Sequence, residues 1–163
     1  MEIRRATGGD VPGIRRVAER SWERDYPSFL TRETIASGVE EWYGAESIRA
    51  DIANPRSVVV VAVDDDTVVG FAHGHRSDGT GHVLRVYVDP DRRRTGIATD
   101  LFQAVRREFR EAGVERVRAM ALAENEPGCS FYRSLGMDRV DTDTTTIDGD
   151  RYEEAVFEEV SKR

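Results

Sequence analysis

The amino-acid sequence predicts an α/β fold with a mixed sheet. Apolar, β-branched runs separated by short polar turns, between residues 58 and 88, indicate a series of antiparallel strands. The segment 97–109 instead places apolar residues at steps of four, which is typical of an amphipathic helix. Because another apolar run follows that helix, residues 83–123 form a strand–helix–strand unit, whose two strands are expected to be parallel.

The first third of the chain is expected to contain one short strand and two helical regions. Residues 2–6 form the strand, and Asp10 caps a helix that begins at Val11. Apolar residues recur at helical spacing from there to Trp22. A second helical region is expected from about Thr31 to Ala53, where an Asn-Pro pair ends it.

Three antiparallel strands are expected next. Val58–Val63 and Thr67–His75 are joined by three consecutive aspartates and form a hairpin. A glycine-rich turn then leads into His82–Val88, which stops at an Asp-Pro pair.

The last third contains the expected crossover helix and a closing hairpin. The helix opens near Gly96 and ends at Gly113, and the strand Val114–Ala123 follows it. A shorter helix over Pro127–Leu135 precedes a hairpin that turns through residues 147–151.

Length and composition narrow the class of protein further. A chain of 163 residues is expected to form one domain, 1–163, and the sequence has neither an apolar run long enough for a membrane span nor a signal peptide. We therefore expect a cytoplasmic protein without a membrane partner. The single cysteine, Cys129, excludes an intrachain disulfide and a multi-cysteine zinc site, so no metal is expected. The formal net charge of −7 argues against nucleic-acid binding.

The loop between the strand that ends at Val88 and the helix that opens near Gly96 is the most informative segment. It contains three consecutive arginines, 92–94, at a helix N-terminus, where free backbone N–H groups and the helix dipole favour an anion. Gly96 lets the backbone approach a phosphate closely, and the small Ala98 lets the helix lie close to the sheet. The alternative is that the arginines form only a solvated charged run.

Two motifs resemble the GNAT acetyltransferase superfamily. The loop has the spacing Arg93-x-x-Gly96-x-Ala98, which is similar to the acyl-CoA pyrophosphate loop of that family. Further along, Asn125 precedes the segment Phe-Tyr-Arg-Ser-Leu-Gly-Met at 131–137, which looks like the second family signature with methionine in place of the usual final phenylalanine. The two motifs occur in the order and the strand–loop–helix context that the family requires.

The resemblance implies both a detailed fold and an activity. The fold would have a mostly antiparallel sheet of about six or seven strands with a splayed parallel pair, flanked by about four helices. The activity would be an acetyl-CoA-dependent N-acetyltransferase that moves an acetyl group to a primary amine of a small metabolite, a protein N-terminus or a lysine. Acetyl-CoA would be the cosubstrate and no metal would be needed.

The resemblance also implies which residues contact the cosubstrate. The backbone of residues 86–88 would run beside the pantetheine arm, and the loop before the helix would surround the pyrophosphate with its N–H groups. The residues expected in contact are Val86, Tyr87, Val88, Arg93, Arg94, Thr95, Gly96, Ile97, Ala98, Thr99, Asn125 and Tyr132. Alternatively, Asn125 caps the helix that begins at Pro127, a role that is compatible with the first.

Tyr132 is the expected general acid, because a phenol can donate a proton or a hydrogen bond to the departing CoA thiolate. The identity of the general base is not determined by the resemblance. Some relatives have a glutamate five residues before the conserved asparagine, but this chain has Met120 there. His82, Glu124 or a base acting through ordered water are the alternatives. Cys129 is expected to be a packed residue rather than a nucleophile, so the transfer is expected to be direct, in a ternary complex.

The acceptor side is less well determined by the sequence. The first two helices and the final hairpin would wall the acceptor pocket, and their aromatic residues are Trp22, Tyr26, Phe29, Trp42 and Tyr43. Most of these are expected to be core residues. Two other functions stay open: a non-catalytic acyl-CoA-binding module, suggested by Met120, and a nucleic-acid binder using the three arginines, which the net charge disfavours. Pairing of the last strands across a homodimer is compatible with the polar segment 142–146.

Overall fold

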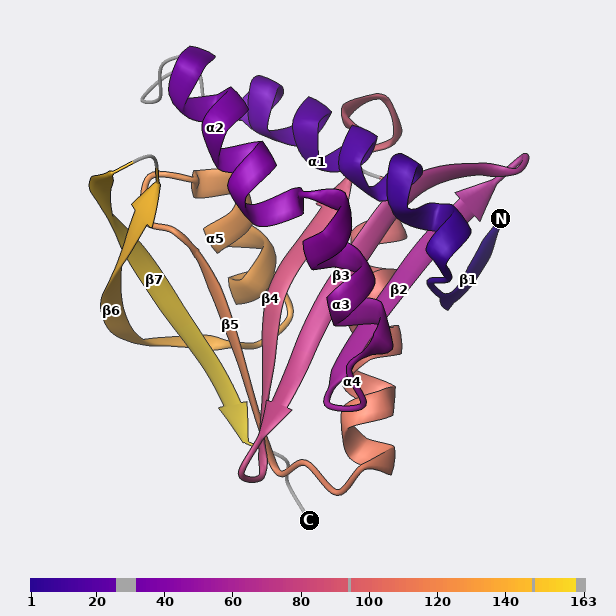
Figure 1. Ribbon diagram of the computed structural model, residues 1–163. Coiled ribbons are helices and arrows are strands. Elements are labelled where there is room, and N and C mark those ends of the chain that lie inside the picture. Colours follow the sequence, from indigo (N-terminus) through magenta and orange to yellow (C-terminus); the bar gives the residue numbers. More distant parts are fainter. Residues whose placement is uncertain (26–31, 94, 148, 161–163) are drawn as a thin grey trace.

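The computed structural model describes residues 1–25, 32–93, 95–147 and 149–160, and of these it describes only the backbone at 25, 32, 33, 35–37 and 41. The described residues contain one seven-stranded sheet, in the order β1-β2-β3-β4-β5-β7-β6 (Figure 1). The strands are β1 Glu2–Arg5, β2 Ser57–Asp64, β3 Thr67–Ser77, β4 Thr80–Val88, β5 Arg116–Leu122, β6 Asp138–Ile147 and β7 Asp150–Val160. Only β4 and β5 pair in parallel among these strands, so the predicted mixed, mostly antiparallel sheet is confirmed.

The helices cover both faces of this sheet. They are α1 Val11–Asp25, α2 Arg32–Tyr43, α3 Ala45–Ala53, α4 Ile97–Glu111 and α5 Glu126–Ser134, with short 3₁₀ turns at Gly8–Asp10 and Pro90–Arg92. Helices α1–α3 lie on one face, and α4 and α5 lie on the other (Figure 1). No helix in the described ranges combines the length and the apolar character needed to cross a lipid bilayer.

The expected helical region from Thr31 to Ala53 is divided into α2 and α3. Gly44 lies between them with φ −59° and ψ 146°, an extended conformation that cannot continue a helix. Glycine is also the weakest ordinary helix former after proline, which explains the break at this position. The expected start at Thr31 lies outside the described residues.

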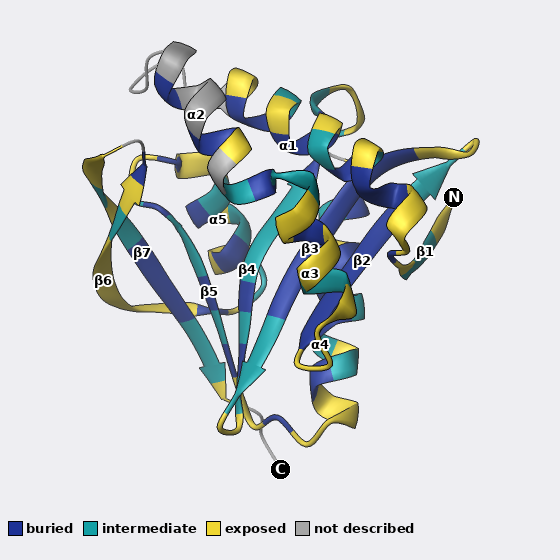
Figure 2. Ribbon diagram, viewed as in Figure 1, coloured by how far each residue is buried: buried dark blue, intermediate teal, exposed yellow. Residues whose placement is uncertain are grey.

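Side-chain alternation along the central strands produces two apolar layers. In β2, Val58 and Val60 pack toward α4, whereas Val59 and Val61 pack toward α1–α3. Figure 2 shows the resulting burial of β2 and β3 between the two helix layers, and the exposure of most of β6 at the sheet edge. The unbroken valine run therefore reflects burial of the strand on both faces.

Strands β4 and β5 pair over four residues only and then separate. Their register runs from Thr80 opposite Arg116 to Val83 opposite Ala119. Beyond this point β4 stays paired with β3, while β5 stays paired with β7. The two strands meet near one end and diverge toward the end where α5 lies (Figure 1). The splayed parallel pair that the resemblance implied is therefore present.

Two glycines let α4 approach the sheet at the paired end of β4. A Cβ on Gly81 would lie 2.4 Å from the Phe109 ring, and one on Gly74 would lie 2.6 Å from the same ring. Phe109 is fully buried, so its ring is enclosed by the core. The close packing of α4 on β3 and β4 thus requires glycine at both positions.

We expect Gly81→Ala to lower the free energy of unfolding by about 1–3 kcal/mol, because the added methyl group overpacks the Phe109 ring. Gly8→Ala is the control: a Cβ there meets nothing within 4 Å, and its effect should stay within about 0.5 kcal/mol. Urea unfolding of the three proteins measures both values. Equal stability of the two variants would contradict this packing account.

Candidate active site

The separation of β4 from β5 begins at a β-bulge. His73 on β3 faces Arg85 on β4, but the next residue, Gly74, faces Val83, so Leu84 is an extra residue on β4. Such a bulge reverses the side-chain alternation, and bulges are often found beside active sites. Because of it, Arg85 and Tyr87 project toward the α1–α3 side, while Val86 packs on the α4 side.

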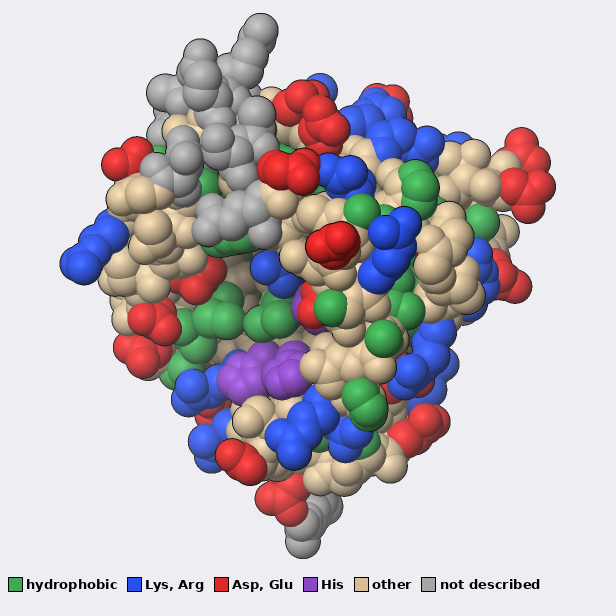
Figure 3. Space-filling view, viewed as in Figure 1, with side chains coloured by type: hydrophobic (Ala, Val, Ile, Leu, Met, Phe, Trp, Pro, Cys, Tyr) green, Lys and Arg blue, Asp and Glu red, His purple; other side chains and the backbone are tan. Residues whose placement is uncertain are grey.

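Pockets on both faces of the sheet open onto this separation. Five residues border both of them: Leu84, Arg85, Tyr87, Met120 and Ala121. The pocket on the α5 side is further lined by Val86, Asn125, Gly128, Phe131 and Tyr132. The pocket on the α1–α3 side is further lined by Trp42, Leu122, Thr145 and Glu154. Figure 3 shows the latter face, with a hollow beside a patch of histidine side chains.

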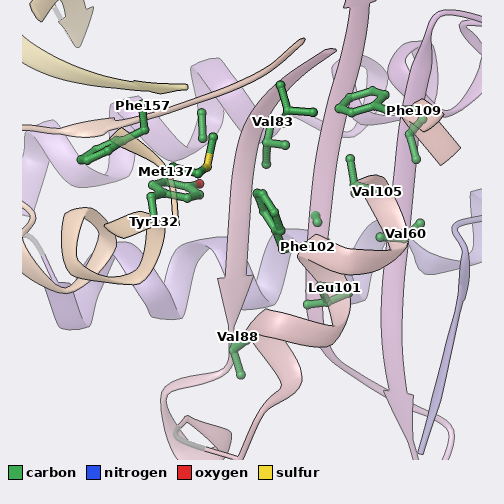
Figure 4. Packing of buried hydrophobic residues seen from close by; sticks show 14 of the residues in the cluster. Val60, Val83, Val88, Leu101, Phe102, Val105, Phe109, Tyr132, Met137 and Phe157 are labelled. Atoms are coloured by element: carbon green, nitrogen blue, oxygen red, sulfur yellow. The ribbon is translucent and has the colours of Figure 1, made fainter. Parts of the chain in front are cut away.

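Tyr132 lies at the α5 side of the opening. Its ring packs between Phe102 and Phe157, with centroid distances of 6.3 and 5.7 Å, and its hydroxyl group points toward β4 (Figure 4). Burial raises the pKa of this phenol well above its ordinary value, an effect that the charge of Arg85 only partly opposes. Tyr132 therefore keeps its proton at neutral pH and can donate it or a hydrogen bond into the pocket.

Asn125 is the N-cap of α5. Its Oδ1 accepts a hydrogen bond from the backbone N–H of Gly128 at 3.1 Å, and the side chain also borders the pocket. A Cβ on Gly128 would lie 2.9 Å from the Asn125 amide nitrogen, so glycine leaves room for the cap. The capping role of Asn125 is therefore present, and it is compatible with a contact to a ligand.

The loop after β4 is fixed by acidic side chains. Asp89 accepts a hydrogen bond from the backbone N–H of Asp91 at 3.0 Å, and Arg20 of α1 binds both carboxylates at 3.1 and 2.7 Å.

Two arginines of the loop also have partners. Arg92 forms an ion pair with Asp64 at the end of β2. Arg93 donates from Nε to the carbonyl oxygen of Val88 at 3.3 Å.

These contacts bear on the expectation that the arginines at 92–94 favour an anion. The charge of Arg92 is compensated by Asp64, so this side chain organises the loop rather than presenting a free cation to an anion. Arg94 lies outside the described residues. Among the described residues, the backbone also offers a favourable environment for an anion.

The N-terminus of α4 supplies that environment. Gly96 has φ +85°, in the left-handed region, and no side chain caps the helix. The first helical hydrogen bond runs from Asp100 N–H to Gly96 carbonyl at 3.0 Å, so the N–H groups of residues 97–99 have no partner within the helix. Thr95, whose hydroxyl donates to the Arg92 carbonyl at 2.7 Å, and Gly96 are exposed at this end. Such an arrangement binds phosphate groups.

The structure does not bring the two predicted bases to the opening. His82 faces His75 and Arg118 in the paired part of β4, where burial first, then the charges of Arg118 and His75, lowers its pKa. Glu124 is exposed in the turn after β5. Neither residue lines the two pockets at the β4–β5 separation.

Glu154 of β7 is an acidic residue at the opening that the sequence analysis missed. It faces Leu122 of β5 and lines the pocket on the α1–α3 side. Burial, and then the neighbouring Asp143 of β6, raises the pKa of its carboxyl group, while Arg85 acts in the opposite direction. The alternation of Tyr152, Glu154 and Val156 could have placed Glu154 on this face, but only the register with β5 shows that it reaches the opening.

Of the five aromatic residues predicted to wall the acceptor pocket, three have described side chains, and two of these are core residues. Trp22 is fully buried and Tyr43 nearly so, in the layer between α1–α3 and the sheet. Trp42 is half-buried and does line the pocket on this face. Tyr26 and Phe29 lie outside the described residues.

Comparison with known proteins identifies the family. Residues 15–137 match the Acetyltransferase (GNAT) family. The chain belongs to the GNAT acetyltransferase family. It is 26% identical over 147 residues to a spermidine N(1)-acetyltransferase of Thermoplasma acidophilum, covering 88% of this chain and 91% of that protein. It is also 30% identical over 141 residues to a mycothiol acetyltransferase of Saccharopolyspora erythraea, covering 84% of this chain but only 43% of that longer protein.

A solved structure with bound coenzyme A supports the same assignment. The crystal structure of PaiA N-acetyltransferase from Thermoplasma acidophilum in complex with coenzyme A is 25% identical, covers 98% of each chain and superposes with a TM-score of 0.88. The present GNAT protein is an acetyl-CoA-dependent N-acetyltransferase. The three N–H groups at α4 and the exposed left-handed glycine before them fit the diphosphate of that cosubstrate.

Cys129 and the arrangement of the acidic and histidine side chains bear on two other kinds of chemistry. Cys129 is buried, and burial raises the pKa of its thiol, which disfavours a nucleophilic thiolate. Within the described part of the chain, no three His, Cys, Asp or Glu residues are grouped so that they could hold a metal ion.

We expect Gly96→Ala to weaken coenzyme A binding by about 5- to 30-fold, because alanine costs about 1–2 kcal/mol in the left-handed conformation that aims the α4 amides. Gly113→Ala is a matched control: Gly113 has φ +82° at the other end of α4, and a Cβ meets nothing at either site. Calorimetry should show the loss of affinity for Gly96→Ala alone. Equal dissociation constants for the two variants would contradict a binding role for Gly96.

Proposed function

We propose that this GNAT enzyme transfers the acetyl group directly to a small primary amine, in a ternary complex whose two substrates enter from opposite faces of the sheet. The observation that carries the proposal is the pair of pockets that share five lining residues on β4 and β5. An acyl donor on the α5 side and an amine on the α1–α3 side would meet between the diverging strands. Direct transfer then needs no covalent acyl-enzyme.

On the donor side, the chain's main role is to bind and orient. The N–H groups of residues 96–99 would hold the diphosphate, and the backbone of Val86–Val88 would lie along the pantetheine arm with Asn125 beside it. Acetyl-CoA supplies the activated acetyl thioester. A backbone N–H left without a cross-strand partner where β4 leaves β5 would polarise the thioester carbonyl.

Tyr132 is proposed as the group that assists departure of the CoA thiolate. Its phenol is protonated at neutral pH, borders the donor pocket and is held by aromatic packing on two sides. A proton or hydrogen bond donated to the sulfur would stabilise the leaving group.

Glu154 is proposed to receive the ammonium form of the acceptor and take its proton. A lysine-like amine with a pKa near ~10.4 is neutral only about once in 2,500 molecules at pH 7, so a base near the acceptor is needed. Glu154 lines the acceptor pocket, whereas His82 and Glu124 do not. Its raised pKa makes the carboxylate a better proton acceptor than an exposed glutamate.

The spermidine N(1)-acetyltransferase relative supports a small amine as the acceptor rather than a protein side chain. The alternative, a non-catalytic acyl-CoA-binding module, is suggested by Met120, which stands at the opening where some relatives carry an acid. Turnover decides between the two functions. Thiol release from acetyl-CoA across a panel of amines supports the enzyme, whereas coenzyme A binding without any turnover supports the module.

We expect Tyr132→Phe to lower kcat by about 10²–10⁴-fold, because the phenol is lost while the ring keeps its packing. The dissociation constant of coenzyme A, measured by calorimetry, should change little, which separates the loss of chemistry from a loss of binding. An unchanged kcat would remove Tyr132 from the proposed mechanism.

We expect kcat to fall on the acid side of its pH profile as Glu154 becomes protonated, at a pH above the ordinary glutamate range because its pKa is raised. Glu154→Gln should lower kcat and abolish this limb. Asp143→Asn removes the negative neighbour across the β6–β7 pair, lowers the pKa of Glu154 and should therefore shift the limb to lower pH. A limb that is identical in all three proteins would exclude Glu154 as the base.

A further inference from the structure

Arg85 presents an unusual charge at the centre of the acceptor face. It is the first residue after the bulge on β4, and its guanidinium lies 5.5 Å from the Trp42 ring centroid and 5.1 Å from that of Tyr43. It lines both the acceptor pocket with Glu154 and a narrower neighbouring pocket with Asp51 and His73. The two aromatic rings orient the guanidinium plane and leave its N–H edge for a polar partner.

That edge lacks an anionic partner among the described residues. Nη1 contacts Nδ1 of His73 at 3.2 Å, but Nε is fully buried without any hydrogen-bond partner. The pKa of His73 is lowered to about 3 by burial first and then by the charges of Arg85 and His75, so this imidazole is neutral and cannot compensate the charge. The guanidinium therefore has no hydrogen-bonded anion among the described side chains, and a ligand that supplies one would complete the site.

Two other arginines of the same sheet are paired with a carboxylate. On β5, Arg118 binds Glu158 at 2.7 Å, and Arg116 binds the same side chain at 3.4 Å. Near Arg85, the Asp51 carboxylate instead approaches His73 at 3.8 Å, and Glu154 forms no ion pair with the guanidinium. Nε2 of His73 is a further buried polar atom without a hydrogen-bond partner in this region.

We infer that the acceptor carries a carboxylate, which Arg85 binds, in addition to the amine that faces Glu154. This inference rests on the proposed function, because it assigns a substrate class to the same site. The planar N–H fork of arginine matches a carboxylate, and the Trp42 and Tyr43 rings hold the guanidinium in place. The pocket thus offers a cation and an anion side by side, which suits a zwitterionic amino acid.

A simple diamine matches this arrangement less well. A second ammonium group placed at the position of the carboxylate would meet the Arg85 charge at close range. Asp51 and Glu154 interact electrostatically with Arg85 at this face and attract cations in general, so the charge of the whole region does not distinguish the two classes. The distinction depends on Arg85 itself, and matched acceptors can test it.

The experiment compares amino acids with the amines that lack their carboxyl group: lysine with cadaverine, ornithine with putrescine, and alanine with ethylamine. Thiol release gives kcat/KM, and mass spectrometry identifies the acetylated product. We expect the preferred amino acid to exceed its amine by about 10- to 100-fold in kcat/KM, as a charge-assisted hydrogen bond allows. Arg85→Gln should reduce the ratio of the two kcat/KM values to about one. Arg85→Lys keeps the charge but loses the planar pair of N–H donors, so it should retain part of the preference for the amino acid.

Arg118→Gln is the matched control. Arg118 lies on β5 and is paired with Glu158, so its loss should leave the ratio as in the wild type. Coenzyme A calorimetry shows whether each variant is folded. If Arg85→Gln does not fold, the wild-type ratios and Arg85→Lys still decide the question.

The outcomes separate this inference from the function on which it rests. Amines acetylated as well as or better than their amino acids by the wild type, or a ratio that survives Arg85→Gln, would overturn the carboxylate assignment and leave the N-acetyltransferase function standing. Absence of turnover on every acceptor, with coenzyme A bound, would overturn both. A ratio that depends on Arg85 and not on Arg118 supports the assignment.

Discussion

The separation of β4 from β5 after four paired residues is the constraint on which the rest of the site depends. The bulge at Leu84 starts it and turns Arg85 and Tyr87 toward one face of the sheet while Val86 packs on the other. A regular parallel pair would satisfy the backbone groups of both strands and close the sheet at this position. Instead, Tyr132 and Glu154 border the same opening from opposite faces.

The core fixes the parts that surround this opening. Phe109 packs against Gly74 and Gly81 at the paired end of β4, so α4 is held close to the sheet there. At its other end α4 begins at Gly96, next to the loop that Arg20 and Asp89 tie to α1. The amides of α4 therefore have a defined direction relative to β4, an arrangement that would let the proposed donor site form without much reordering of the backbone.

Local signals in the sequence predicted much of this arrangement, and long-range pairing accounts for the rest. The strand–loop–helix unit, the glycine at the start of the crossover helix and the helix that carries Tyr132 all follow from neighbouring residues. Glu154 was missed because its place depends on the register between β7 and β5, which no local pattern specifies. Likewise, the pairing of Arg92 with Asp64 joins segments far apart in the chain, and the sequence alone suggested a free basic run.

We propose that the backbone at the start of α4 and along the diverging end of β4 holds acetyl-CoA. Hydrogen exchange resolved at single amides, with and without coenzyme A, is the decisive test of this binding site. N–H groups at a helix N-terminus exchange rapidly because they lack a partner, so coenzyme A should slow exchange at Ile97, Ala98 and Thr99. Saturating coenzyme A that leaves these three rates unchanged would contradict the account.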